Sequence, residues 1–177
     1  MDANELELVR SAQRGEVEAF SALVERYWTR LVGLARSVVG DTDAEDCVQE
    51  GMVLIWEKLP GLRDCGAFPA WGMRIVARRC LRRARRRLRS LPLESLPEAA
   101  DLGTYQSWER IHVEQALARL PPRQRAVMHL TVIDGMTDSE IGAALAIDAA
   151  SVRSHRRRAR ETLREILDER RPFGGKE

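Results

Sequence analysis

The apolar residues of this chain recur at intervals of three and four positions, and no segment alternates apolar and polar residues as a half-buried strand does. A clear example runs through Phe20, Leu23, Val24, Tyr27 and Leu31. This spacing places one apolar stripe along each expected helix, which must then pack on a neighbouring helix. We therefore predict an all-α protein without strands.

Local stop signals divide the chain into two small helical domains joined by a flexible linker. Residues 90–106 hold two prolines, one glycine and three acidic residues, a composition typical of a linker. We expect domains over 1–89 and 107–177. Capping boxes at 42–45 and 137–140 open two of the helices. The expected helices cover about 5–14, 20–39, 42–59, 67–89, 107–120, 122–134, 137–145 and 149–169.

The formal net charge of +2 hides a strong segregation of charge along the chain. Residues 1–64 are acidic overall, whereas residues 65–93 hold nine arginines and no acidic residue. Such a block favours a polyanionic partner, and the alternative is a solvated arginine-rich helix. No run of 18 apolar residues and no apolar leader is present, so we expect a cytoplasmic protein without membrane insertion.

The segment 137–163 has the sequence pattern of a helix-turn-helix: a short helix, a three-residue turn at 146–148 and a long helix with a basic face. Asp148 is expected to cap the long helix. In this geometry the second helix enters the major groove, where arginine can bind guanine. A plain helical hairpin with a charged face is the alternative. The residues expected to face DNA are Ser151, Arg153, Ser154, His155, Arg157 and Arg158.

A second cationic helix is expected over 67–89, with arginines 74, 78, 82, 85 and 89 on one face. Trp71 lies beside them, and an aromatic ring on a cationic helix can stack on an unpaired base. Packing of Trp71 in the core and phosphate contact without sequence reading are the alternatives. On the preceding helix, acidic residues lie opposite the apolar stripe, either as a solvated face or as a dock for a basic partner.

We find no nucleophile–base pair, phosphate-binding loop or metal-spaced cluster, so we expect neither an enzyme nor a bound cofactor or metal. Three cysteines without a CxxC pair argue against a disulfide scaffold or zinc ribbon. Buried, inert thiols are the expected state of Cys47, Cys65 and Cys80, with redox sensing as the alternative, and Cys65 is the one expected in a loop.

The motifs together resemble the extracytoplasmic-function (ECF) group of bacterial RNA polymerase sigma factors, in the sigma-70 family. DTDAEDCVQEGMVLIWEKL (41–59) is similar to the family's acidic pattern, and AFPAWGMRIVARRCLRRARRR (67–87) is similar to its arginine-rich helix. ALARLPPRQRAVMHLTVIDGMTDSEIGAALAIDAASVRSHRRRARETLRE (116–165) resembles the second module almost throughout. The resemblance covers about 8–167 and is far more specific than a helix-turn-helix alone.

The resemblance implies a subunit that binds the β′ and β subunits of core RNA polymerase and directs transcription from promoter DNA, under the control of an anti-sigma factor. The helix-turn-helix would read the −35 element. The β′ subunit would be bound by Asp43, Asp46, Gln49 and Glu50. The melted −10 strand would be held by Arg63, Asp64, Trp71, Arg74, Arg78, Arg79 and Arg82.

Five residues depart from the family pattern, one of them Ala146, which stands in the turn where glycine is common. Arg78 and Arg82 stand where asparagine is frequent, which favours phosphate contact over base reading. Arg156 stands where an aliphatic residue usually faces the first helix of the pair, and Gly72 replaces a large apolar residue. A stand-alone helix-turn-helix regulator is the alternative function, but it gives no role to the acidic helix or to residues 68–89.

Overall fold

The computed structural model describes residues 2–90, 113 and 115–169, and all regular structure in these residues is helical. This agrees with the predicted all-α class. The proposed linker over 90–106, apart from Ser90, and half of the helix expected at 107–120 lie outside the described residues. The helices are α1 (Ala3–Gln13), α2 (Val17–Val39), α3 (Asp41–Lys58), η1 (Leu59–Gly61), η2 (Cys65–Ala67), α4 (Phe68–Ser90), α6 (Pro122–Val132), α7 (Asp138–Leu145) and α8 (Ala149–Glu169).

Most helix boundaries fall where the local signals predict them. Pro69 lies in the first turn of α4 and Pro122 opens α6, where a missing N–H costs little. The predicted capping box at 42–45 is wrong, because α3 begins earlier, at Asp41, and no side chain caps it. Gly40, with a positive φ of 85°, makes the break between α2 and α3, so no Thr42 cap is needed.

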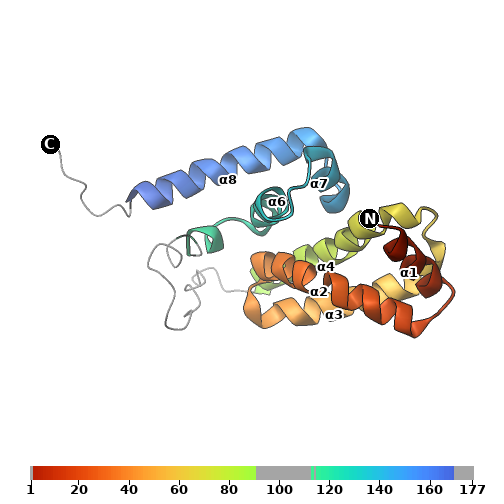
Figure 1. Ribbon diagram of the computed structural model, residues 1–177. Helices are drawn as coiled ribbons and strands as arrows, with labels where there is room; N and C mark the ends of the chain where they lie inside the picture. Colours follow the sequence, from red (N-terminus) through yellow and green to blue (C-terminus); the bar gives the residue numbers. More distant parts are fainter. Residues whose placement is uncertain (1, 91–112, 114, 170–177) are drawn as a thin grey trace.

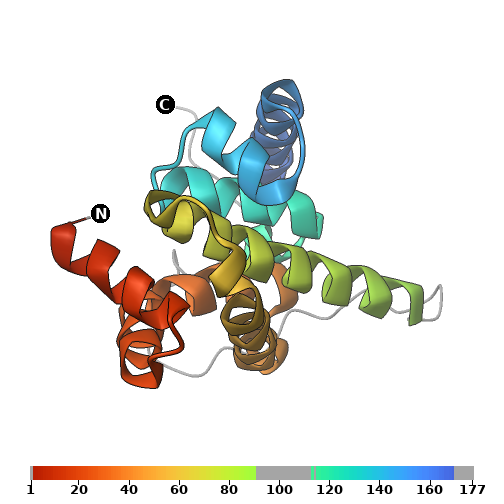
Figure 2. The same ribbon diagram turned by 90° about the vertical axis from the view of Figure 1, so that its right-hand side faces the viewer.

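Helices α1 to α4 form the N-terminal module, and α6 to α8 form the C-terminal module (Figure 1). Figure 2 shows α4 between the two groups of helices, and α4 packs against α2 and α3 on one side and against α7 on the other. Buried side chains from Val9 to Val152 form one continuous apolar cluster. The two modules therefore share a core in this conformation.

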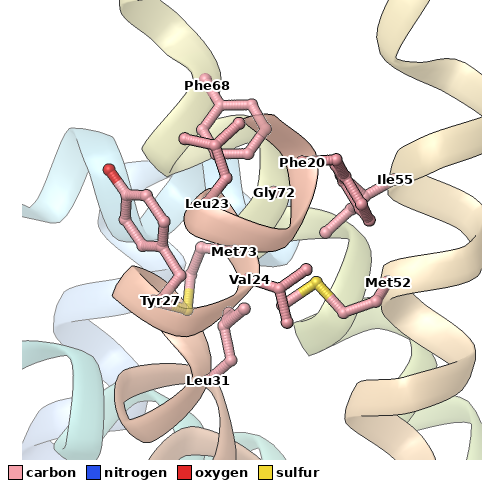
Figure 3. Close-up of a pocket in the computed structure, with 10 residues that line it drawn as sticks. All are labelled: Phe20, Leu23, Val24, Tyr27, Leu31, Met52, Ile55, Phe68, Gly72 and Met73. Atoms are coloured by element: carbon pink, nitrogen blue, oxygen red, sulfur yellow. The ribbon is translucent and has the colours of Figure 1, made fainter. Parts of the chain in front are cut away.

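Inside the N-terminal module, side chains from α2, α3 and α4 converge on a small apolar cavity at Gly72 (Figure 3). Gly72 leaves this space open, since a Cβ there would lie 3.5 Å from Ile55 Cδ1. At Gly51 the helices approach much more closely, because a Cβ there would lie 2.8 Å from Val76 Cγ2. The small residue at 51 therefore permits the α3–α4 contact.

Candidate nucleic-acid interface

The helix-turn-helix is built by two side-chain caps and one left-handed residue. Thr137 and Glu140 form the predicted capping box at the start of α7. Ala146 ends α7 with a φ of 55°, so the turn uses a conformation that an L-residue adopts only at a cost. Asp148 then caps α8, as predicted: its Oδ1 accepts from the Ser151 N–H at 2.7 Å. These local bonds fix the direction in which α8 leaves the turn.

An ion pair joins the first half of α8 to the start of α7. Arg156 donates to both carboxylate oxygens of Asp138, at 2.5 and 3.2 Å, and the two side chains are only 23% and 24% exposed. The hydrogen bond from Arg156 lowers the pKa of Asp138 most, and the nearby Arg153 adds to the effect. Arg156 can therefore occupy a position that is usually aliphatic, because its charge is paired with Asp138 inside the motif. Val152 and Ala159, on the same helix, are fully buried.

The residues of α8 that are expected to face DNA differ in how exposed their side chains are. Arg153, Arg157 and Arg158 are exposed, whereas Ser154 and His155 are half-buried. Ser151 donates its hydroxyl to Asp148 and is thus part of the cap. Burial, followed by the charges of Arg123 and Arg158, lowers the pKa of His155, so its ring is neutral at pH 7.

The arginines of α4 separate into two faces. Arg79, Arg83 and Arg87 face α3, where Arg83 binds Asp43 at 2.6 Å and Arg79 pairs with Glu50. The hydrogen bond with Asp43 raises the pKa of Arg83. Arg78 and Arg82 are exposed on another face, and neither forms an ion pair with any described residue. The second face is therefore the one open to a phosphate backbone.

The acidic residues of α3 divide in the same way. Asp43 is 21% exposed and Glu50 39%, and both carboxylates are engaged by arginines of α4. Asp46 is 65% exposed and reaches Arg83 only at 3.8 Å, and Gln49 is exposed as well. Of the four residues expected to dock the polymerase, Asp46 and Gln49 are thus the most available to a partner.

The remaining residues of the expected −10 site surround the start of α4. Arg63 is exposed, and Asp64 caps η2 by accepting from the Gly66 N–H at 2.8 Å. Trp71 is half-buried against Phe68, with the ring centroids 6.2 Å apart, so one part of the indole remains accessible. Arg74 is half-buried on the same helix.

Sequence reasoning missed the contacts between the modules. Arg30 Nε of α2 lies 2.5 Å from Asp134 Oδ1, and Arg125 of α6 donates to the Val38 carbonyl at 2.8 Å. One signal for the first contact was present in the sequence. A carboxylate just after a helix C-terminus is electrostatically disfavoured, so Asp134 needed a cation from elsewhere.

Comparison with known families matches both modules. Residues 23–90 match Sigma-70 region 2, and residues 111–163 match Sigma-70 region 4. The chain therefore belongs to the sigma-70 family.

The RNA polymerase sigma-E factor of Streptomyces avermitilis is 33% identical, over 88% of this chain and 89% of that protein. The ECF sigma factor SigE of Mycolicibacterium smegmatis is 31% identical over 89% of this chain, which spans only 65% of that longer protein. Within the family, the chain groups with the ECF sigma factors.

A solved structure shares the fold. The sigma factor RpoE of Bartonella quintana, determined in complex with the anti-sigma factor NepR, matches with a TM-score of 0.69 and 24% identity. The match covers 86% of this chain and 98% of that one.

The resemblance and the all-α class predicted from the sequence are confirmed, and membership in a non-enzymatic family confirms that the chain is not an enzyme. No described helix is long and apolar enough to cross a bilayer.

Proposed function

We propose that this ECF sigma factor binds core RNA polymerase in the cytoplasm, through the β′ and β subunits, and directs it to promoters. In this proposal α8 reads the −35 duplex, and the exposed face of α4 with Trp71 holds the melted −10 strand. The observation that carries the proposal is the presence of two separate exposed arginine surfaces on one chain, one of them built on a helix-turn-helix. Two weak DNA contacts joined on one polymerase raise each other's effective concentration.

The polymerase contact is assigned to α3. Asp46 and Gln49 are exposed on that helix, and their neighbours Asp43 and Glu50 extend the same polar surface. An acidic helical surface fits a basic partner surface by charge complementarity. Control by an anti-sigma factor is also proposed, supported by the anti-sigma complex of the Bartonella protein with the same fold.

Size-exclusion chromatography of the protein with bacterial core RNA polymerase tests the proposal. We expect co-elution at a 1:1 ratio, and we expect Asp46→Arg with Gln49→Arg to abolish it. Both side chains are exposed, so the substitutions spare the short Arg83–Asp43 and Arg79–Glu50 pairs and remove only the 3.8 Å contact between Asp46 and Arg83. Glu57→Arg, at an exposed position of the same helix, is the control for a general charge effect. Failure of the folded wild-type chain to co-elute would favour a stand-alone helix-turn-helix regulator.

A further inference from the structure

The last residue of α1, Gln13, ties the N-terminal helix to the connection between α3 and α4. Its Nε2 donates to the carbonyl of Leu59 at 3.1 Å and to that of Leu62 at 2.7 Å. Its Oε1 accepts from the thiol of Cys65 at 3.2 Å. The partners lie 46 to 52 positions further along the chain, in residues 59–67, which we call the α3–α4 loop.

The three hydrogen bonds of Gln13 require a side-chain amide. Two carbonyl oxygens need donors, and the thiol needs an acceptor, so the NH₂ group faces the carbonyls and the oxygen faces the sulfur. An ionised glutamate has the same shape but no donor, and its charge would lie against two carbonyl oxygens. A methionine fills a similar volume and donates no hydrogen bond.

Helix α1 is a firm support for this amide. Val9 is fully buried, and Glu5 is only 3% exposed. The Glu5 carboxylate accepts from the Tyr27 hydroxyl and lies 3.5 Å from Arg26, both on α2. Figure 1 shows α1 beside the α3–α4 loop, and α1 contacts both η1 and η2 there. Gln13 is therefore presented to the loop from a helix that is itself anchored on α2.

The α3–α4 loop carries two of the residues expected to hold the −10 strand. Arg63 and Asp64 are exposed, and they lie directly between Leu62 and Cys65, the loop partners of Gln13. The hydrogen bonds from Gln13 thus hold the loop on both sides of the exposed pair. A loop that is already ordered loses less conformational entropy when it binds, so this order favours binding.

We infer that Gln13 is a positioning residue for the −10 contact, which holds the α3–α4 loop in the conformation that presents Arg63 and Asp64 to the melted strand. The inference rests on the proposed function for that contact, whereas the hydrogen bonds belong to the free chain. Loss of the Gln13 amide should therefore loosen the loop in the free protein. In the complex it should weaken the −10 contact and leave the −35 contact unchanged.

Amide hydrogen exchange of the full-length protein, followed by NMR, measures whether Gln13 holds the loop. The Leu62 N–H donates to the Leu59 carbonyl at 3.0 Å and the Ala67 N–H to the Asp64 carbonyl at 3.1 Å, so both amides report on loop order. We expect Gln13→Met to raise both exchange rates roughly tenfold, because the loop loses two hydrogen bonds that stabilise its closed form.

Two further variants separate lost hydrogen bonds from lost packing. Gln13→Glu keeps the shape of the side chain and replaces the donor with a carboxylate, so it should raise the exchange rates at least as much as Gln13→Met. Arg14→Ala is the matched control, because Arg14 adjoins Gln13 but bonds to Ser11 and Glu16 in its own segment. Exchange as slow in Gln13→Glu as in Arg14→Ala and the wild type would overturn the inference.

The positioning role is read from sequence selection by the holoenzyme, which is core RNA polymerase with the full-length protein bound. The probe is a pool of short single-stranded DNAs of randomised sequence, and the bound strands are sequenced. Arg63→Ala identifies the nucleotide positions whose selection depends on the loop. We expect Gln13→Met to reduce enrichment at the same positions roughly tenfold. Combining it with Arg63→Ala should add no further loss there, because both act through one contact.

The possible outcomes separate this inference from the proposed function. An equal loss of enrichment at every position would make Gln13 a merely structural residue, and unchanged enrichment with a loosened loop would also refute the positioning role. In both cases selection by the wild type, and its dependence on Arg63, would leave the −10 contact standing. If the wild type selects no sequence, or Arg63→Ala changes nothing, the −10 contact assigned to the loop fails and the inference fails with it.

Discussion

Among the helices that the structure describes, α4 and α8 are the two richest in arginine, yet their surroundings differ. Three arginines of α4 pair with acidic residues of α3. The positive charge on that face of α4 is therefore neutralised within the N-terminal module. In α8 the strongest internal pair is Arg156 with Asp138, and Arg153 and Arg158 remain exposed. The number of arginines on a helix therefore does not give the number available to DNA.

Within α8, Arg153 is exposed and Arg156 is paired inside the motif, so substitutions at these two positions should have the largest and most different effects. Arg153→Ala should cost about 1–3 kcal/mol in binding at one −35 base pair and relax specificity there, because the guanidinium is 60% exposed, has only a 3.7 Å contact with Asp138 and can reach a base. Competition binding with single-base variants of the promoter measures this. A uniform loss on every sequence would instead assign Arg153 to a phosphate.

Arg156→Ala should change stability rather than specificity. It removes the bidentate pair that joins α7 to α8, so we expect Tm to fall by about 2–4 °C. Thermal unfolding followed by circular dichroism measures the change, with Arg153→Ala as the matched control from the same helix. A larger loss of Tm in Arg153→Ala would reverse our assignment of the two residues.

The two faces of α4 predict opposite behaviour for two double variants. Arg79→Ala with Arg83→Ala should lower the free energy of unfolding by about 1 kcal/mol, since half-exposed ion pairs contribute little each. Arg78→Ala with Arg82→Ala should leave stability unchanged. It should instead reduce the slope of log affinity against log salt for single-stranded DNA by about 1.4, or about 0.7 per phosphate contact. Equal slopes for the two double variants would show that the faces are not distinct.

The smallest effects concern two residues whose backbone preferences do not suit their positions. Gly72→Ala should stabilise α4 by up to about 1 kcal/mol, since the cavity has room for a methyl group. Ala146→Gly should stabilise the left-handed turn of the helix-turn-helix by about 0.5 kcal/mol, after the greater freedom of glycine in the unfolded chain is subtracted. Urea unfolding measures both. Gly51→Ala is the control and should destabilise, because its Cβ would meet Val76.

The sequence predicts the local parts of this molecule well and the long-range parts poorly. The Thr137 box and the Asp148 cap depend on residues three positions apart, and both appear as predicted. The α3 start was misplaced because Gly40 made a break that a cap motif does not encode. Whether Arg79 faces α3 or solvent depends on the packing of two helices, which periodicity alone does not determine. The Arg30–Asp134 contact spans 104 positions and was not predicted at all.

The internal neutralisation of α4 also affects how much of the protein is bound to non-specific DNA in a cell. A bacterial chromosome offers millions of non-specific sites, and any cationic protein is distributed among them in proportion to the counterions it releases. By binding Arg79, Arg83 and Arg87 within the fold, the acidic residues of α3 lower that number. The protein is therefore less titrated by bulk DNA, and a larger share of it stays available for its specific partner.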